Sequence, residues 1–176
     1  MKVYKLTTPL TKESIAKLKA GDKVLLSGKI ITARDQAHMR LIDLINKKKK
    51  LPIDINNQII YYTGPSPAKS GDIIGACGPT TSARMDGITE PLLKKGLKGT
   101  IGKGERSKEI QGMIKKYKAP YLVNMGGGGA LLNEIVISSK IVAFKDLSAG
   151  AIRELTIKNM PLYVAYDIKG GSIYNT

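Results

Sequence analysis

KVLLSGKIITARDQAHMRLIDLINKKKK, residues 23–50, is the stretch from which the fold prediction starts. Its first ten residues form a nearly continuous apolar run, which predicts a buried strand. The polar turn TARD follows, and beyond it we expect an amphipathic helix that begins near Asp35 and ends in lysines, which suit the negative end of the helix dipole. The apolar positions at helical spacing are Ala37, Leu41, Leu44 and Ile45.

The same alternation of strand and helix continues outward along the chain. Thr11 can cap a short helix over 12–18, and TGPSPAKSGD, residues 63–72, is a loop by its glycine and proline content. Further strands are expected at 54–62, 72–78 (DIIGACG), 97–102, 119–123, 141–144, 161–168 and 172–176. Further helices are expected around 89–95, after the turn GKGERS as far as 117, and after the glycine run 126–129, where we expect close backbone packing. This pattern predicts an α/β fold.

Composition limits the class of protein. With 176 residues, 42% hydrophobic and 24% charged, the sequence predicts one globular domain over 1–176. It contains neither an apolar stretch long enough to span a membrane nor a secretory signal at the N-terminus, so we expect a cytoplasmic protein with no membrane partner. The single cysteine, Cys77, is too few for an iron–sulfur or zinc site, so no metal ligand is expected in this chain.

The formal net charge of +15 raises the alternative of a basic nucleic-acid-binding module. Such surfaces usually rely on arginine forks and stacking aromatics, whereas this chain has few arginines, no tryptophan and one phenylalanine. We therefore expect no nucleic-acid partner. A basic surface that is merely solvated, that steers a small dianion or that docks an acidic partner subunit fits the same composition.

Three turns that lead into expected helices share one chemistry. They are TARDQAH (32–38), GPTTSARMD (78–86) and IGKGERS (101–107). If a strand precedes each, the turns point several helix N-termini, with unpaired N–H groups, at one edge of a sheet. Arg34, Arg84 and Lys103 lie in these turns, so cations and free amides would converge there. The pattern predicts a site for a carboxylate or phosphate.

Several residues of these turns also have a purely structural interpretation. Asp35 can be an N-cap, and Thr80, Thr81 or Ser82 can cap the helix after Arg84. His38, the only histidine, lies four residues after Arg34 and three after Asp35 on one helix face. It is either a structural histidine or a general acid or base held by Asp35.

Taken in order, TARDQAH, GPTTSARMD, IGKGERS, YLVNMGGGGAL and PLYVAYDIKGGSIY resemble the beta subunit of two-subunit class I fumarate hydratase and the related tartrate dehydratase. The resemblance covers nearly the whole chain, and GPTT-x-x-RM-[DE] with a downstream GKG is its most specific part. Two departures are the run GGGG, where the family has a more alanine-rich turn, and Ala83, where fumarases commonly have glycine.

The resemblance implies a single layered, swivelling β/β/α domain with strand-to-helix turns along one edge. It implies a partner alpha subunit that carries a [4Fe–4S] cluster, in a hetero-oligomer such as α2β2. The open iron of that cluster would act as a Lewis acid on the substrate, and this chain would supply cations and proton-transfer groups.

The resemblance also implies roles for individual residues. Arg34, Arg84 and Lys103 would bind the substrate carboxylates. Thr80 would be nearest the C–H proton, with His38 as the rival proton carrier. The supporting residues would be Asp35, Thr81 and Asp86.

The implied reaction is the reversible hydration of fumarate to (S)-malate, with L-tartrate dehydration as the close alternative. Asp86 and the GKGERS continuation favour the fumarase branch. Another swivelling-domain hydro-lyase subunit, such as an aconitase-like small subunit, is a further enzymatic alternative, and it would act on a larger branched acid.

Overall fold

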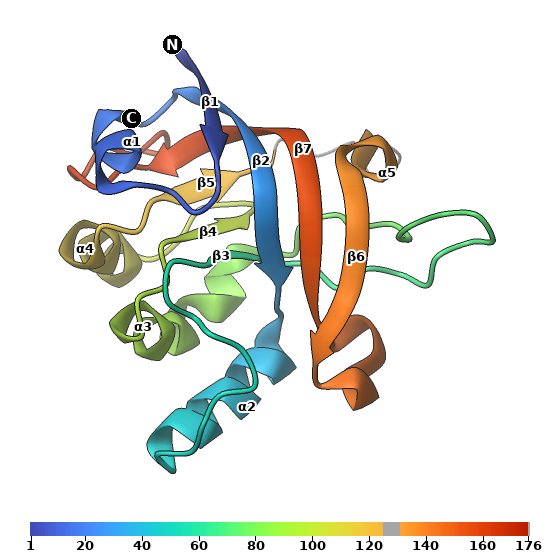
Figure 1. Ribbon diagram of the computed structural model, residues 1–176. Coiled ribbons are helices and arrows are strands. Elements are labelled where there is room, and N and C mark those ends of the chain that lie inside the picture. The colour runs from blue at the N-terminus through green and yellow to red at the C-terminus, as the bar shows by residue number, and fades with distance from the viewer. Residues whose placement is uncertain (125–130, 176) are drawn as a thin grey trace.

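The computed structural model describes residues 1–124 and 131–175 (Figure 1). The glycine run 126–129, for which close backbone packing is predicted, lies outside the described residues. Within them, seven strands form one sheet in the order β1-β2-β3-β4-β5-β7-β6. No helix of the described part is long and apolar enough to cross a membrane.

Five strands of this sheet are mutually parallel. They are β1 (Val3–Thr7), β2 (Lys23–Thr32), β3 (Ile59–Tyr61), β4 (Gly99–Gly102) and β5 (Tyr121–Val123). In the register, Thr32 pairs with Tyr61, Tyr61 with Ile101, and Gly102 with Val123. The carboxyl ends of β2, β3, β4 and β5 therefore lie side by side at one edge of the sheet.

The sheet closes on itself through β7 (Ile152–Tyr166). This long strand runs antiparallel to β5 at its end and to β2 along the whole length of β2, from Lys23–Tyr163 to Thr32–Arg153. Strand β6 (Val136–Ala143) lies on the other side of β7. The long strands β2, β7 and β6 thus form one layer and the short strands β3, β4 and β5 a second (Figure 1).

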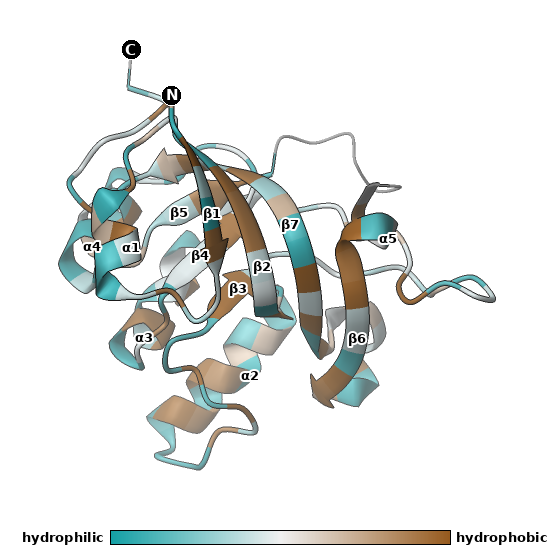
Figure 2. Ribbon diagram, turned by 45° about the horizontal axis from the view of Figure 1, so that its top comes forward, coloured by the Kyte–Doolittle hydropathy of each residue, from teal (hydrophilic) through white to brown (hydrophobic). Residues whose placement is uncertain are grey.

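A third layer, made of helices, covers the outer face of the short strands, and the alternation of side chains in these strands explains why. In β3, Ile59 and Tyr61 belong to the apolar cluster enclosed by the two layers of strands, whereas Ile60 and the following Tyr62 belong to a cluster shared with the helices. The helices α2 (Asp35–Asn46), α3 (Asp86–Lys94) and α4 (Lys108–Tyr117) lie along these strands in one row, in which α2 contacts α3 and α3 contacts α4. Figure 2 shows apolar residues concentrated on the strands, while these helices alternate apolar and hydrophilic residues.

Several predicted elements are confirmed by the structure. The apolar run 23–32 is strand β2 and the amphipathic helix begins at Asp35. Thr11 caps α1 (Lys12–Lys17), with its Oγ1 accepting from the amide of Ser14 at 3.1 Å. The predicted α/β class is also confirmed, and β1 is a strand that the pattern did not predict. The swivelling motion stays a prediction.

The predicted strand 72–78 is wrong. This segment is the returning half of a loop that follows β3, and its hydrogen bonds stay within the loop and its base. The amides of Ser66 and Ala76 donate across the loop to Ala76 O and Ser66 Oγ, and Gly75 packs so closely on Ser66 that a Cβ would overlap it. Ile74 and Cys77 are buried, which explains the apolar character that suggested a strand.

The predicted strands at the C-terminal end also need correction. Residues 172–176 form no strand in the described part: Ser172 makes an isolated bridge with Tyr166, and the Asp167 carboxylate accepts from the amides of Lys169 and Gly171 to hold a turn. The strand predicted at 161–168 is instead the end of β7, which already begins at Ile152. The one predicted at 141–144 lies mostly within β6, which begins at Val136. Three short helices complete the described part: the 3-10 helices η1 (Ser82–Met85) and η2 (Lys145–Gly150), and the α-helix α5 (Leu131–Ile135).

Two glycines distinguish a tight contact from an open position. A Cβ on Gly102, at the end of β4, would overlap Ser82 Oγ, whereas a Cβ on Gly112, within α4, meets nothing. Gly102→Ala should lower the free energy of unfolding by about 1–3 kcal/mol because Ser82 must move. Gly112→Ala should raise it by about 0.5–1 kcal/mol because alanine is the better helix former. Urea unfolding of both variants measures this, and equal effects would contradict the packing.

Candidate functional site

The predicted site residues lie at the edge where β2, β3, β4 and β5 end. Arg34 and Asp35 follow β2 directly, and Lys103 follows β4 directly. The segment 79–86 reaches the same edge from the loop after β3, because the amide and Oγ1 of Thr80 both donate to Tyr62 O, at 2.8 and 3.1 Å. The second of the three predicted turns is thus delivered by a returning loop and not directly by a strand. Ligands of open α/β sheets commonly bind outside the carboxyl ends of the strands.

Two of the three predicted carboxylate-binding cations meet at one carboxylate. Arg84 Nη2 donates to Asp35 Oδ2 at 2.9 Å, and Arg34 Nε lies 3.9 Å from Asp35 Oδ1. The side chains of Arg34, Asp35 and Arg84 are 31%, 40% and 54% exposed. Ion pairs this exposed are weak, at about 0–1 kcal/mol, so both guanidinium groups stay available to an anion.

A polar hollow opens beside Arg34. Its volume is about 280 Å³, and it is lined by Arg34, Asp35 and Gln36 of the start of α2 and by Leu147, Ala149 and Gly150 of η2. Gly64 allows the arginine to lie here, since a Cβ at that position would come within 2.7 Å of Arg34 Cδ and 2.9 Å of Ala149 O. Two of the predicted site residues, Arg34 and Asp35, thus line this hollow.

Lys103 and Thr81 lie next to each other through a bridge between their backbones. The amide of Ser82 donates to Lys103 O at 3.0 Å, and the amide of Lys103 donates to Ser82 Oγ at 3.1 Å. Both Thr81 and Lys103 are exposed, and Ser82 is buried. This bridge holds the start of the segment that includes Arg84 against the end of β4, and so places the third cation at the same edge.

His38 is the predicted site residue that does not face solvent. It is 0% exposed, and its Nδ1 lies 2.7 Å from Arg34 O, while Asp35, its expected partner, pairs with Arg84. Burial lowers the pKa of His38 to about 4, so the ring is neutral at neutral pH. Between about pH 4 and 6.5, His38 is protonated in the unfolded chain but stays neutral in the folded one. The free energy of unfolding therefore decreases as the pH falls through this window.

Comparison with known proteins identifies the family of this chain. The family model described as "Fumarase C-terminus" matches residues 1–176. The chain belongs to this fumarase family. The resemblance inferred from the five motifs is thereby confirmed.

Named relatives of this fumarase-family chain fall into two groups. It is 42% identical over 171 residues to the "Putative L(+)-tartrate dehydratase subunit beta" of Methanocaldococcus jannaschii, a match that covers 94% of this chain and 88% of that protein. It is 34% identical to the anaerobic class I fumarate hydratase of Escherichia coli K12 and 31% identical to fumarate hydratase 2 of Leishmania major. These two matches cover 93% and 97% of this chain but 31% of each fumarate hydratase, so the chain spans about a third of their length.

Arg106 is a buried residue of the fumarase-family chain that the sequence analysis missed. Its side chain is 1% exposed, and it donates from Nε to Asp86 Oδ1 at 2.7 Å and from Nη2 to Thr89 Oγ1 at 2.9 Å. The guanidinium also lies 5.3 Å from the ring centroids of Tyr62 and Tyr121. One sequence signal was available: an arginine just before the N-cap Ser107 is unfavourable at a helix start unless an anion pairs with it.

Asp86, predicted as a supporting residue, is that anion. Its second oxygen accepts from the amide of Ser107 at 2.7 Å, so one carboxylate joins the starts of α3 and α4. Its hydrogen bonds run to Arg106 and Ser107 and not to Arg34 or Arg84. Asp86 thus links α3 to the start of α4, and its role as a supporting residue of the site stays a prediction.

Cys77 lies in the core of this fumarase-family chain. It is 0% exposed, its carbonyl accepts from Tyr61 Oη at 2.6 Å, and burial raises the pKa of its thiol to about 11. Within residues 1–124 and 131–175, no group of three or more His, Cys, Asp or Glu side chains could hold a metal ion. An iron–sulfur cluster does not fit the described residues and would need ligands from elsewhere.

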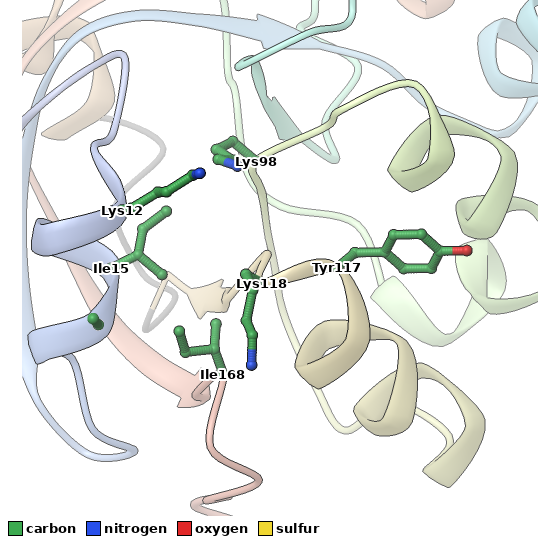
Figure 3. A pocket seen from close by; sticks show the side chains of 7 residues that line it. Lys12, Ile15, Lys98, Tyr117, Lys118 and Ile168 are labelled. Atoms are coloured by element: carbon green, nitrogen blue, oxygen red, sulfur yellow. The ribbon is translucent and has the colours of Figure 1, made fainter.

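A second hollow lies at the other end of the strands from Arg34, Arg84 and Lys103. Its volume is about 280 Å³. Figure 3 shows Lys12 and Ile15 projecting from α1 toward this space, with Lys98, Lys118 and Ile168 around its other sides. Lys98 comes just before β4, so this hollow lies at the amino end of that strand, opposite the candidate site. Its lining is largely apolar, whereas that beside Arg34 is largely polar.

Replacement of the buried Arg106 should lower the free energy of unfolding far more than replacement of a surface arginine. Arg106→Met leaves the Asp86 carboxylate without its cation and should lower the free energy of unfolding by about 3–5 kcal/mol. The matched control Arg40→Met removes a bidentate pair with Asp146 whose side chains are 42% and 66% exposed, and it should cause a much smaller loss because exposed ion pairs are weak. Urea unfolding of both variants tests this. Similar losses would contradict a central role for Arg106.

Proposed function

We propose that this chain is the beta subunit of a hydro-lyase that reversibly hydrates fumarate to (S)-malate. The observation that supports it best is the meeting of Arg34 and Arg84 at Asp35, on the edge where Lys103 also follows a strand. Two partly exposed guanidinium groups and an ammonium group suit a small dicarboxylate with separate charges at its two ends. The relatives that share this chain's sequence are named as hydro-lyases of such acids.

The cations would act in the reaction as well as in binding. Removal of a proton next to a carboxylate moves negative charge onto that carboxylate. A guanidinium placed there stabilises the charge more in the transition state than in the bound substrate, because the charge is still developing. Arg84, on the same short segment as Thr80, is suited to this role, while Arg34 and Lys103 would hold the other charged oxygens.

Thr80 is the proposed proton-transfer group. Its Oγ1 is half-buried and donates to Tyr62 O, so in this structure the hydroxyl proton is directed to the backbone. To accept a proton from carbon, the hydroxyl must first lose its own, which requires a positive local field. Arg34, Arg84 and Lys103 would supply that field at the edge of the sheet.

The cluster and the oligomer are also proposals. Since the described residues offer no cluster site, we assign the [4Fe–4S] cluster to a partner alpha subunit in an assembly such as α2β2. The relative from Methanocaldococcus jannaschii is named as a subunit beta, which supports the existence of such a partner. The basic character of the chain, +15 in 176 residues, suits both an anionic substrate and an acidic partner surface.

L-Tartrate dehydration is the second candidate, favoured by the 42% identity to the protein named for that reaction. Asp86 favours the fumarase branch as a motif, but it contacts Arg106 and Ser107 and can affect the substrate only through the position of the Arg84 segment. Turnover of fumarate, (S)-malate, L-tartrate and D-tartrate by the assembled enzyme separates the candidates. We expect the highest kcat/KM with fumarate, and a higher value with L-tartrate would select the alternative.

The isolated chain should depend on its partner. Purified alone and treated anaerobically with iron and sulfide, it should show no cluster absorbance and no hydration of fumarate, because Cys77 is its only thiol and is buried. Activity should appear on mixing with the cluster-loaded alpha subunit, measured by the loss of fumarate absorbance. Turnover by the chain alone would contradict the proposal.

Thr80→Val keeps the shape of the side chain and removes its hydroxyl. In the assembled enzyme, kcat should fall by about 100-fold or more, the usual scale for a proton-transfer group, while KM changes little. Thr7→Val, at an exposed position of β1, is the matched control and should leave both constants unchanged. A normal kcat for Thr80→Val would show that this threonine is only a structural hydrogen-bond donor.

Arg84→Ala should change mainly KM, whereas Thr80→Val should change mainly kcat. A charge-assisted hydrogen bond worth about 1.5–3 kcal/mol would be lost, so KM for fumarate should rise by about one to two orders of magnitude, with a smaller fall in kcat. Arg40→Ala removes an arginine that pairs with Asp146, and it serves as the control. An unchanged KM for Arg84→Ala would contradict carboxylate binding.

A further inference from the structure

His38, the only histidine of the chain, connects two parts of the candidate site from below. It lies in the first turn of α2, where both its backbone amide and its ring Nδ1 reach Arg34 O, at 2.9 and 2.7 Å. Its ring lies 5.5 Å from the ring of Tyr62, at an angle of 55°. Tyr62 O in turn accepts both hydrogen bonds from Thr80. One buried side chain therefore contacts the backbone of Arg34 and packs against Tyr62, the residue that holds Thr80.

The contacts of the ring determine where its proton lies. A carbonyl oxygen can only accept, so Nδ1 carries the hydrogen and donates it to Arg34 O. Nε2 then has the lone pair, and it is buried without a partner among the described residues. A second proton there would place a charged donor in the core with no acceptor, at a high free-energy cost.

The charged groups around the ring do not remove this cost. Asp35, on the same helix, favours the protonated ring, but its carboxylate is hydrogen-bonded to Arg84. Arg106, from the segment before α4, opposes protonation, and Tyr62 of the β3 end presents a neutral ring. Burial is the strongest influence and lowers the pKa of the ring, although the hydrogen bond to Arg34 O and the charge of Asp35 raise it. The ring is thus both neutral and closed to solvent, and a substrate at the open edge cannot exchange a proton with it.

We propose that His38 is a positioning residue, whose Nδ1–H holds the backbone of Arg34 while its ring packs against Tyr62, so that it sets the spacing between the Arg34 and Thr80 segments. The inference rests on the proposed function in that Arg34 and Thr80 are taken to act on substrate. It changes the role of His38 from rival proton carrier to the support of both groups.

Nuclear magnetic resonance tests the protonation state without any activity. Because the chain has one histidine, ¹⁵N labelling of histidine gives a single pair of imidazole signals. In the full chain we expect protonated Nδ1 and unprotonated Nε2, with shifts that stay constant between about pH 5.5 and 8, where an exposed histidine titrates near its usual pKa of about 6.5. A titration within this range, or a proton on Nε2 in place of Nδ1, would overturn the proposal.

Two variants test the positioning role. His38→Asn can return an N–H donor near the place of Nδ1, whereas His38→Leu fills the space without a donor. In spectra of the full chain, the amide signals of Arg34 and Thr80 should move in His38→Leu and move less in His38→Asn. If neither signal moves in His38→Leu, the ring does not support these segments and the proposal fails.

Kinetics of the assembled enzyme give the functional readout. For His38→Leu we expect a rise of about tenfold in KM with a smaller change in kcat, the size of one neutral hydrogen bond, and for His38→Asn partial rescue. A proton carrier would instead lose about 100-fold or more in kcat in both variants, and that result would overturn the proposal. If the wild-type assembly turns over neither fumarate nor tartrate, the proposed function fails, while the spectra still decide the role of the ring.

Discussion

The guanidinium of Arg106 is the interaction on which the arrangement of the site depends. It is buried where α3, α4 and the ends of β3 and β4 meet, and it pairs with Asp86 while it donates to Thr89, Thr100 and Tyr62. A buried cation is tolerated only when its donors are matched, and here four side chains supply the acceptors: two from α3, one from β4 and one from the end of β3. This requirement ties the starts of two helices to the strand ends below the candidate site.

Closure of the sheet brings the separate sequence motifs together at one edge. The four parallel strands β2 to β5 could end at different heights, but their pairing places Thr32, Tyr61 and Ile101 next to one another. The long strand β7 then pairs with both β2 and β5 and prevents the sheet from opening. The turns that follow these strands must therefore share a surface, and the cations of those turns gather there.

The site divides into a polar surface and a buried support. Four residues keep substantial exposure: Arg34, Asp35, Arg84 and Lys103. The two arginines, although paired with Asp35, therefore stay accessible to an anion. Below them, His38, Ser82 and Tyr62 are buried. His38 and Ser82 are hydrogen-bonded to the backbone of Arg34 and Lys103, and Tyr62 O accepts from Thr80. Rigid support under adaptable side chains is the arrangement that precise binding of a small substrate requires.

Local chemistry was enough to predict several parts of this protein from its sequence. Apolar periodicity determined strand β2 and helix α2, and the charged turns TARD, GPTTSARMD and IGKG identified the cations of the site, since these signals depend on neighbours only a few residues apart. The same reasoning failed for 72–78, where burial of Ile74 and Cys77 in a loop imitates a strand, and it missed the first half of β7.

Long-range contacts decided the rest. The spacing R-D-x-x-H places Arg34, Asp35 and His38 on one helix face, but it does not predict their partners. Asp35 pairs with Arg84, 49 residues away, and His38 donates to the carbonyl of Arg34. Likewise Arg106 is buried only because Asp86, Thr89 and two tyrosines converge on it from other elements. The sequence by itself determined which residue types stand at the ends of the strands. Only the tertiary structure decided which of them face solvent and which are enclosed, because burial and pairing depend on segments brought together by closure of the sheet.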